Sequence, residues 1–164
     1  MKKPLVAIVM GSDSDLETMN EARKILKEFG ISFETRILSA HRAPLATAKF
    51  ALEAENCGTK VIIAGAGGAA HLGGVIAAHT CLPVIGVPIE TKSLQGMDSL
   101  LSIVQMPGGI PVATMAIGKA GAKNAGILAA QIIATQDKTL RRKINEYKKK
   151  LVKEVLKKDR KQRG

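Results

Sequence analysis

Uninterrupted runs of apolar residues recur along this chain, and a segment with helical periodicity follows each run. A strand that is buried on both faces of a parallel sheet needs such a run, because helices cover both of its sides. The expected strands are residues 5–10, 31–38, 61–64, 84–87 and 112–117. The expected helices are residues 15–29, 44–56, 72–79, 98–105 and 119–135. This alternation predicts a three-layer α/β fold with a parallel sheet of five strands.

The length of 164 residues suits one domain spanning residues 1–164, with enough chain to bury a core. Composition excludes a disordered chain, and an aromatic content of 2% argues against a base-stacking surface for single-stranded nucleic acid. Residues 61–89 carry no charge and are long enough to cross a membrane. Six glycines, two prolines and two histidines interrupt this stretch, so we expect two strands joined by a loop and a helix, and no membrane partner.

The positive charge of the chain is concentrated at its C-terminus. Residues 138–164 hold 13 of the 25 Lys and Arg residues and only 3 of the 14 Asp and Glu residues. Their pattern predicts a basic amphipathic helix, with Leu140, Ile144, Tyr147, Leu151 and Val155 on one face. The domain already has helices for both faces of its sheet, so we expect this helix to pack on a neighbouring subunit of a homo-oligomer. A basic tail can bind polyanions, but a solvated face is the simpler interpretation, and no nucleic-acid partner is expected.

The two cysteines, Cys57 and Cys81, are far apart in the sequence and form no zinc-binding pattern. They suit a reducing compartment, and the short apolar start lacks the features of a signal peptide, so a cytoplasmic location is expected. No metal-binding motif and no Walker A motif is present, and we expect neither a metal nor a cofactor.

Polar residues follow the first three expected strands at their carboxyl ends. They are Ser12 and Asp15 after the first strand, Ser39, His41 and Arg42 after the second, and the loop 65–71 after the third. Ligands of open α/β sheets bind at this edge. If the strand order is the flavodoxin-like 2-1-3-4-5, these loops converge on one pocket.

The residue types in these loops indicate a phosphate-bearing ligand. Free N–H groups at a helix N-terminus attract phosphate, the guanidinium of Arg42 suits phosphate or carboxylate, and Asp15 can accept hydrogen bonds from ribose. Histidine ordinarily titrates near pH 6.5, at about the right value for proton transfer, which makes His41 the candidate acid/base. The plainer alternatives are that Ser14 caps a helix together with Glu17, that Arg42 forms a surface ion pair and that His41 is structural.

The glycine-rich loop permits a second interpretation. Gly65, Gly67 and Ala70 fit a relaxed G-x-G-x-x-A pattern, which is part of a dinucleotide-binding fingerprint. This pattern usually follows the first strand of its unit, whereas here it follows the third. A flavin- or dinucleotide-binding module therefore remains the weaker alternative.

Several longer motifs closely resemble those of the bacterial 5-(carboxyamino)imidazole ribonucleotide mutase family of de novo purine synthesis. The resemblance covers about residues 5–136, and its motifs are residues 11–15, 39–44, 64–72, 82–88, 98–107 and 116–125. It implies a flavodoxin-like fold, a homo-octamer, and transfer of a carboxylate from the exocyclic nitrogen to ring carbon 4 without ATP, metal or biotin. It also implies that His41 is the general acid/base. The substrate-binding residues that it implies are Ser12, Asp15, Ser39, Arg42, Gly65, Ala66, Gly67, Gly68, His71 and Leu72.

The sequence departs from the family pattern at three positions. Gly73 stands where the family usually has Pro, Ala43 replaces a common Thr, and Leu16 replaces a common Trp. Gly73 could loosen the third loop and so the retention of CO₂. A related animal-type enzyme carboxylates aminoimidazole ribonucleotide directly with CO₂ and typically has Lys after the motif histidine. Arg42 in that position favours the mutase over this direct carboxylase.

Overall fold

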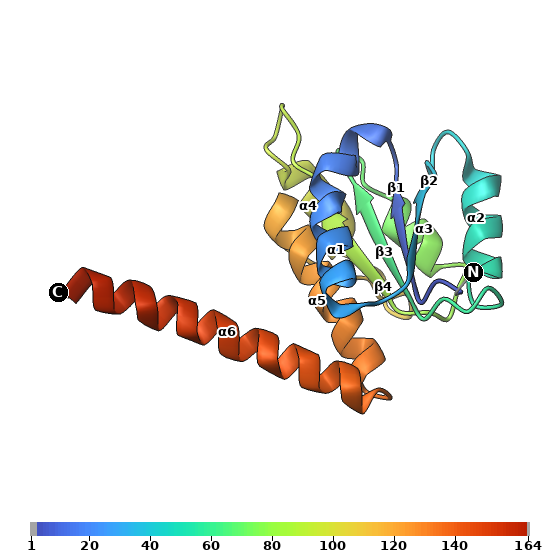
Figure 1. Cartoon of the computed structure of the whole chain (residues 1–164). Helices are drawn as coiled ribbons and strands as arrows, with labels where there is room; N and C mark the ends of the chain where they lie inside the picture. Colours follow the sequence, from blue (N-terminus) through green and yellow to red (C-terminus); the bar gives the residue numbers. More distant parts are fainter. Residues whose placement is uncertain (1–2, 164) are drawn as a thin grey trace.

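The computed structural model describes residues 3–163 and contains one five-stranded sheet in which every pair of strands is parallel. The strand order is β2-β1-β3-β4-β5, which confirms the predicted flavodoxin-like arrangement (Figure 1). The strands are β1 (Val6–Met10), β2 (Phe33–Ile37), β3 (Val61–Ala66), β4 (Val84–Pro88) and β5 (Ala113–Thr114).

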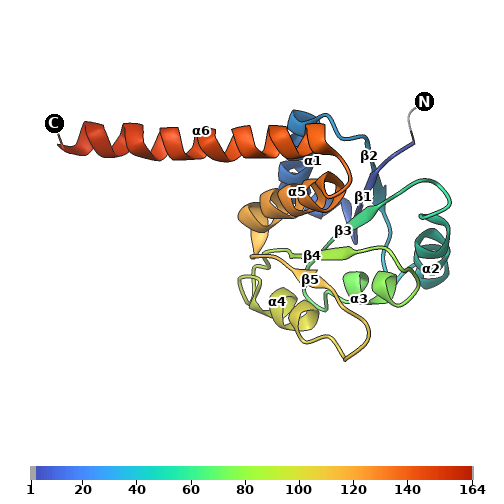
Figure 2. The same ribbon diagram turned by 90° about the horizontal axis from the view of Figure 1, so that it is seen from below.

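Helices cover both faces of this sheet, as the three layers in Figure 2 show. The helices are α1 (Leu16–Phe29), α2 (Pro44–Glu53), α3 (Leu72–Ala77), α4 (Met97–Val104), α5 (Gly118–Ala134) and α6 (Lys138–Arg163). One apolar core lies between the sheet and α1, α5 and the start of α6, and a second lies between the sheet and α2, α3 and α4. The uncharged stretch 61–89 forms β3, α3 and β4, as expected. None of the helices within residues 3–163 is long and apolar enough to cross a membrane.

Strands β1, β3 and β4 are buried along their whole lengths, which explains their uninterrupted apolar sequences. Alternate residues of β1 face opposite cores: Ile8 packs toward α1 and α5, and Val9 packs toward α2 and α3. Both edge strands, β2 and β5, are partly exposed. The buried centre of the sheet therefore fixes the strand order and holds the carboxyl ends of β1, β3 and β4 side by side.

The expected capping of the first helix by Ser14 is wrong. Residues Asp13–Asp15 form a single 3-10 turn, in which the Ser12 hydroxyl accepts a hydrogen bond from the Ser14 backbone N–H. The Ser14 hydroxyl does not cap the helix; it donates a hydrogen bond to the Asp15 carboxylate at 3.2 Å. Helix α1 then begins at Leu16 without a side-chain cap. At its other end the prediction is correct, since Gly30 has a φ of 74° and donates its N–H to the last carbonyls of the helix.

The fifth strand is much shorter than the predicted 112–117, since only Ala113 and Thr114 pair with β4. The chain leaves the sheet after one further hydrogen bond, from the Met115 N–H to the Gly86 carbonyl. It must turn here to enter α5, where Gly121 packs against the carbonyl of Ala116. This early turn replaces the rest of the expected strand.

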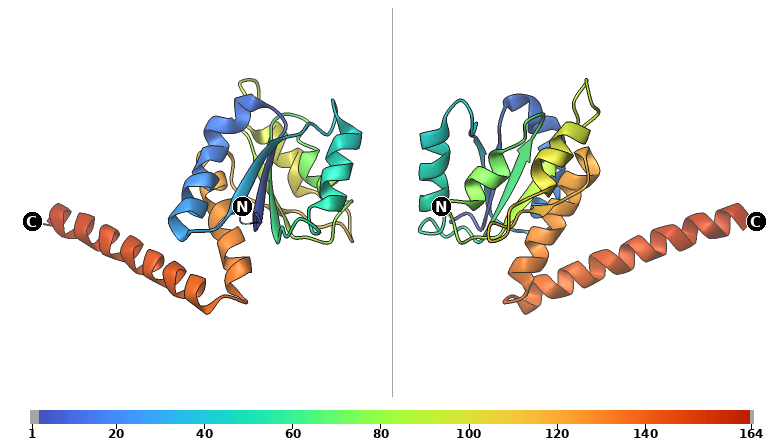
Figure 3. Two further views of the ribbon diagram at one scale, coloured as in Figure 1. Left: turned by 45° about the vertical axis from the view of Figure 1, so that its right-hand side comes forward. Right: turned by 180° about the vertical axis from the view of Figure 1, so that it is seen from behind.

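Helix α6 is an arm that leaves the domain (Figure 3). Leu140 and Ile144 are buried against the domain, and the ring of Tyr147 packs edge-on against Phe29 with centroids 5.5 Å apart. Every residue from 148 to 163 is exposed. The apolar face of the helix therefore packs partly on its own domain, while Leu151 and Val155 remain uncovered.

Candidate active site

Four loops meet at the carboxyl edge of the sheet and enclose a cavity of about 580 Å³. They follow β1, β2, β3 and β4, so the convergence that was assumed from the sequence is present. The cavity is lined by Gly11, Ser12, Ser14, Asp15, Ser39, Ala40, His41, Arg42, Ala66, Gly67, Gly68, Ala69, His71, Leu72, Ile89, Glu90 and Thr91.

Among the residues predicted to bind substrate, Gly65 alone is absent from this lining. It lies within β3, below the floor of the cavity. A Cβ atom at this position would lie 2.5 Å from the Sδ atom of Met19, which is fully buried. Packing against Met19 of α1 is therefore sufficient to explain a glycine at this position.

The two histidines of the cavity are directly paired. His41 follows β2 and His71 precedes α3, and His41 Nε2 lies 2.9 Å from His71 Nδ1. The rings are edge-on, with centroids 5.1 Å apart and planes at 88°. A hydrogen bond at this distance needs a proton on one of the two nitrogens. In this contact one imidazole is the donor and the other the acceptor, so the two rings orient each other at the edge of the cavity.

Arg42 connects the loop after β2 to the loop after β1. Its Nη2 atom donates to the Gly11 carbonyl at 2.8 Å, and its Nε atom and backbone N–H both approach the Ser39 hydroxyl. Within residues 3–163 it forms no ion pair, so the surface ion pair considered from the sequence is not present. Its positive charge is therefore available to an anion in the cavity.

Asp15 is the buried charge of the site. Its side chain is only 8% exposed and accepts a hydrogen bond from the Ser14 hydroxyl. Burial raises the pKa of the Asp15 carboxyl above its ordinary value, while the bond from Ser14 and, more weakly, the charge of Arg42 act in the opposite direction. A ligand hydroxyl that donates to this carboxylate would replace the water that burial has removed.

The glycine-rich loop is held from below by α4, a contribution that the sequence analysis missed. Ser99 is fully buried; its hydroxyl accepts the Gly68 N–H at 3.0 Å and donates to the Ile89 carbonyl at 2.6 Å. The Ser102 hydroxyl shares its proton between two carbonyls, that of Asp98 at 2.6 Å and that of Gly68 at 3.1 Å. Gly68 has a φ of 68°, which glycine adopts without strain. These bonds hold the Gly68 peptide group of the third loop from both sides.

The loop after β4 was also missed as part of the site. Ile89, Glu90 and Thr91 line the cavity, and the Thr91 hydroxyl donates to the Asp98 carboxylate at 2.8 Å. The assumed strand order places β4 beside β3, so the segment after Pro88 could have been found by the same rule that found the other loops.

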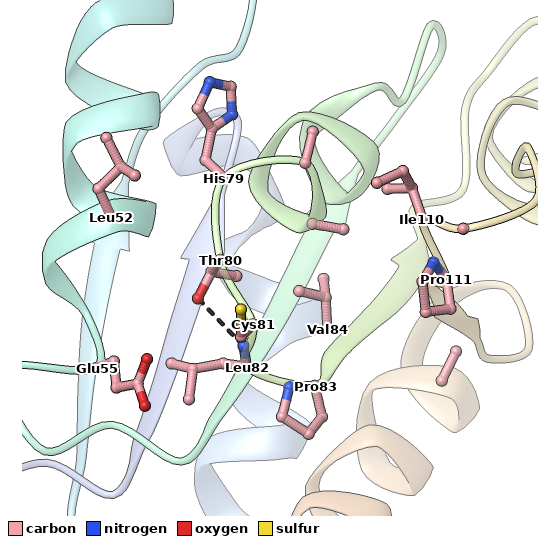
Figure 4. Close-up of a pocket in the computed structure, with 14 residues that line it drawn as sticks. Leu52, Glu55, His79, Thr80, Cys81, Leu82, Pro83, Val84, Ile110 and Pro111 are labelled. Atoms are coloured by element: carbon pink, nitrogen blue, oxygen red, sulfur yellow. Dashed lines mark hydrogen bonds between the residues drawn. The ribbon is translucent and has the colours of Figure 1, made fainter.

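A second cavity, of about 930 Å³, lies at the opposite edge of the sheet, before β4 and β5. Figure 4 shows that its walls are mainly aliphatic, with His79, Cys81 and Glu55 at separate places around it. No set of three His, Cys, Asp or Glu side chains within residues 3–163 is placed to hold a metal ion. This cavity brings together no pair of groups suited to proton transfer.

Comparison with known proteins identifies the family. Residues 5–154 match the family described as AIR carboxylase. The chain belongs to this family. The family match reaches beyond the motifs recognised in the sequence and includes residues 138–154 of α6, so the arm begins inside the matched region.

The similar members of the AIR carboxylase family carry a more specific name. Proteins named N5-carboxyaminoimidazole ribonucleotide mutase from Bacillus subtilis and Thermotoga maritima are each 58% identical to the chain, over 94% of its length and 95% and 90% of theirs. The crystal structure of Treponema denticola PurE is 30% identical, with a TM-score of 0.86 over 96% of this chain and 98% of that one. These findings confirm the family resemblance drawn from the motifs.

Proposed function

We propose that this protein is an N5-carboxyaminoimidazole ribonucleotide mutase of de novo purine biosynthesis. The observation that carries the proposal is the 2.9 Å contact between His41 and His71 beside a cavity that also presents Arg42 and Asp15. The names of the 58% identical relatives support the same reaction. The site thus combines a proton-transfer group with groups that suit an anionic nucleotide.

The loops divide substrate binding between them in this proposal. The phosphate lies near Arg42, whose guanidinium carries no ion pair within residues 3–163, and beside the start of α1. The ribose hydroxyls donate to the buried Asp15 carboxylate. The imidazole ring then reaches the glycine-rich loop and His41.

The carboxylate is transferred in two steps, loss of CO₂ from nitrogen and its recapture by carbon, and His41 transfers a proton in each. His41 first gives a proton to the exocyclic carbamate nitrogen, the bond between this nitrogen and the carboxylate carbon breaks, and CO₂ is released into the cavity. Ring carbon 4 then attacks CO₂ to form the new carbon–carbon bond. His41 finally takes the proton from ring carbon 4, which returns the enzyme to its starting state. Every atom of the substrate is kept, so no other reactant is needed.

His71 is a positioning residue in this proposal. Its Nδ1 atom lies 2.9 Å from His41 Nε2, and this hydrogen bond at the edge of the ring orients the His41 imidazole. A ring that is held in place before substrate binds loses less freedom in the transition state, and this lowers the barrier. Ala66, Gly67 and Gly68 leave room for CO₂ close to the ring, in a loop fixed by Ser99.

A paired-substrate assay tests the proposed reaction. The purified protein is given 5-(carboxyamino)imidazole ribonucleotide in one reaction, and aminoimidazole ribonucleotide with bicarbonate in another. We expect the 4-carboxylated product in the first reaction only. Product in the second reaction alone would identify a direct carboxylase instead. A flavin or nicotinamide absorption band in the purified protein would favour the dinucleotide-binding alternative.

We also propose that residues 1–164 form one domain that assembles into a homo-octamer. Helix α4 exposes Met97, Leu101 and Val104 along one side, although each is a large apolar residue. The apolar cavity before β4 and β5 and the uncovered apolar face of α6 are further unpartnered surfaces. Packing between copies would cover them, with the arm lying on a neighbouring subunit.

A cytoplasmic location completes the proposal. Cys57 and Cys81 are both free thiols and both exposed. Exposed free thiols persist in a reducing compartment and tend to be oxidised outside it. A fractionation experiment with the tagged protein tests this location, and recovery in a secreted fraction would contradict it.

A further inference from the structure

The arm formed by α6 carries more unneutralised positive charge than any role in carboxylate transfer explains. Thirteen Lys and Arg residues and three acidic residues lie between positions 138 and 163. Among the described residues, only Lys149 and Arg163 of these thirteen form an ion pair, each with an acid on the same helix. Like charges one helical turn apart destabilise a helix, so anions that bind to the arm would stabilise it.

Four of these cations form a line along one side of the arm. Arg142, Lys149, Lys153 and Arg160 follow one another at intervals of seven, four and seven residues, which places them on one helical face. We call these four residues the basic stripe. Its length from Arg142 to Arg160 is about 27 Å at the helical rise. Glu146 lies within it, and the hydrogen bond from Lys149, with the charges of Lys149, Lys153 and Arg142, lowers the pKa of this acid.

The basic stripe faces away from the apolar side of the same helix. Arg142, Lys149 and Lys153 each come two residues after an apolar residue, namely Leu140, Tyr147 and Leu151. Two residues correspond to about 200° around a helix, so the two sides are nearly opposite. If the apolar side packs on the domain and on a neighbouring copy, the basic stripe still faces solvent.

We propose that the basic stripe binds the phosphate backbone of double-stranded nucleic acid without base specificity. Among the described residues, Lys149 is the one cation of the basic stripe with an acidic partner, Glu146, so the line of four exposed cations keeps a net positive charge. Such a line suits a regular row of phosphates, whose counterions are released on binding. A single strand is a poorer fit, because the exposed part of the arm after Tyr147 has no aromatic residue for base stacking. A membrane surface is also a poorer fit, because Lys158 falls on the same side as Leu151 and interrupts the apolar face.

This proposal is independent of the mutase reaction. None of the residues of the basic stripe lines the cavity around His41. The sequence alone favoured a solvated face for this segment; the alignment of four cations on a projecting arm is the structural observation that points to a phosphate partner instead.

Fluorescence anisotropy with short labelled DNA and RNA duplexes tests the proposal on the full-length protein. The variant has Gln at all four positions of the basic stripe. We expect the slope of log K against log salt concentration to fall by about three to four, since each lost phosphate contact reduces it by about 0.9. Binding at about 0.1 M salt should weaken at least tenfold. Undetectable binding of the unaltered protein at low salt would overturn the proposal and leave a solvated face.

The control variant removes the same charge elsewhere. It has Gln in place of Lys24, Lys27, Lys49 and Lys60, four exposed lysines of the domain. We expect its salt dependence to stay near that of the unaltered protein. An equal loss in both variants would show that net charge alone attracts the duplex, which contradicts a defined surface. Binding to anionic lipid vesicles that exceeds duplex binding would likewise contradict it.

A second pair of variants has one substitution each and leaves the apolar side of α6 unchanged, so packing through that side should be the same in both. Glu146→Gln removes the acid within the basic stripe, and Glu154→Gln removes an acid that lies off it, so the net charge changes equally. The helix is about 10 Å wide, close to the distance over which salt screens charge. We expect Glu146→Gln to strengthen duplex binding several-fold and Glu154→Gln to change it little. Equal effects of the two variants would overturn the proposal.

Discussion

At the scale of single residues, the arrangement around His41 makes a clear prediction for catalysis. His41→Asn should lower kcat for carboxylate transfer by about 10²- to 10⁴-fold or more, the usual contribution of a general acid/base. Nucleotide binding, measured by calorimetry, and thermal stability should change little, because the His41 side chain is exposed. His79→Asn is the matched control, since that exposed histidine lies just after α3 and outside the cavity around His41, and its ring has one hydrogen-bond partner among the described residues, the Val75 carbonyl. Retained turnover in His41→Asn would remove His41 from the mechanism.

Asp15 gives a prediction for stability and pH. Burial raises the pKa of this carboxyl in the folded protein, so the folded state holds the proton more tightly than the unfolded chain. The free energy of unfolding therefore falls as pH rises from about 3.8, the ordinary pKa of aspartic acid, to the raised value, and stays lower above it.

Asp15→Asn removes this cost at neutral pH. We expect the variant to be more stable than the unaltered protein in urea unfolding at pH 7, and the gain to disappear below about pH 3.8, where the native residue is protonated as well. Substrate affinity should fall at the same time, because the amide accepts ribose hydroxyls more weakly than a carboxylate. An equal gain in stability at both pH values would contradict this explanation.

The residues of the site differ in how far the sequence could predict them. Ser12, Asp15, Ser39, His41 and Arg42 stand directly after apolar runs, so local pattern and the rule for parallel sheets were sufficient to bring them to one cavity. Ser99 acts on Gly68, which lies 31 positions earlier in the chain, and only the packing of α4 creates that contact. Gly65 was expected in the cavity because of its motif, whereas the position of Met19 explains it.

At the scale of helices and strands, the junction between β5 and α5 depends on a glycine. A Cβ atom at Gly121 would collide with the backbone carbonyl of Ala116, which has no freedom to rotate away. Gly121→Ala should lower the free energy of unfolding by about 1–3 kcal/mol or more, although alanine normally favours a helix. Chemical unfolding measures this, with Gly108→Ala as control because nothing lies within 4 Å of its added carbon. Equal stability of the two variants would contradict the packing.

The burial of each helix or strand explains how well its limits could be predicted from the sequence. β1, β3 and β4 were found because burial on both faces demands continuous apolar runs. The end of β5 was not found, because residues 115–117 remain apolar while the chain turns toward α5. The cap of α1 was not predicted correctly, because the Ser14 hydroxyl can bond either the first turn of the helix or the neighbouring Asp15 carboxylate, and the sequence pattern does not distinguish the two.

At the scale of the whole molecule, the exposed apolar side of α4 predicts assembly. Light scattering should give a particle eight times the 17.3 kDa chain. Leu101→Glu should shift this mass to smaller species, because Leu101 is 59% exposed in a single copy and a charge there would be costly to bury. Lys60→Glu also introduces a glutamate, but at an exposed polar position, and should leave the mass unchanged. An unchanged mass for Leu101→Glu would exclude this face from the contact.

The separation of the arm from the domain also makes each chain a permanent electric dipole. Residues 1–137 are nearly neutral, whereas α6 carries almost all of the net charge. Because α5 runs back from the carboxyl edge of the sheet, the root of the arm lies at the opposite edge of the sheet (Figure 1). The cavity with His41 lies at the carboxyl edge. An arm that adsorbs to a cation-exchange bead would therefore leave the nucleotide cavity of the same chain facing away from the bead, so the protein should remain able to turn over substrate while immobilised.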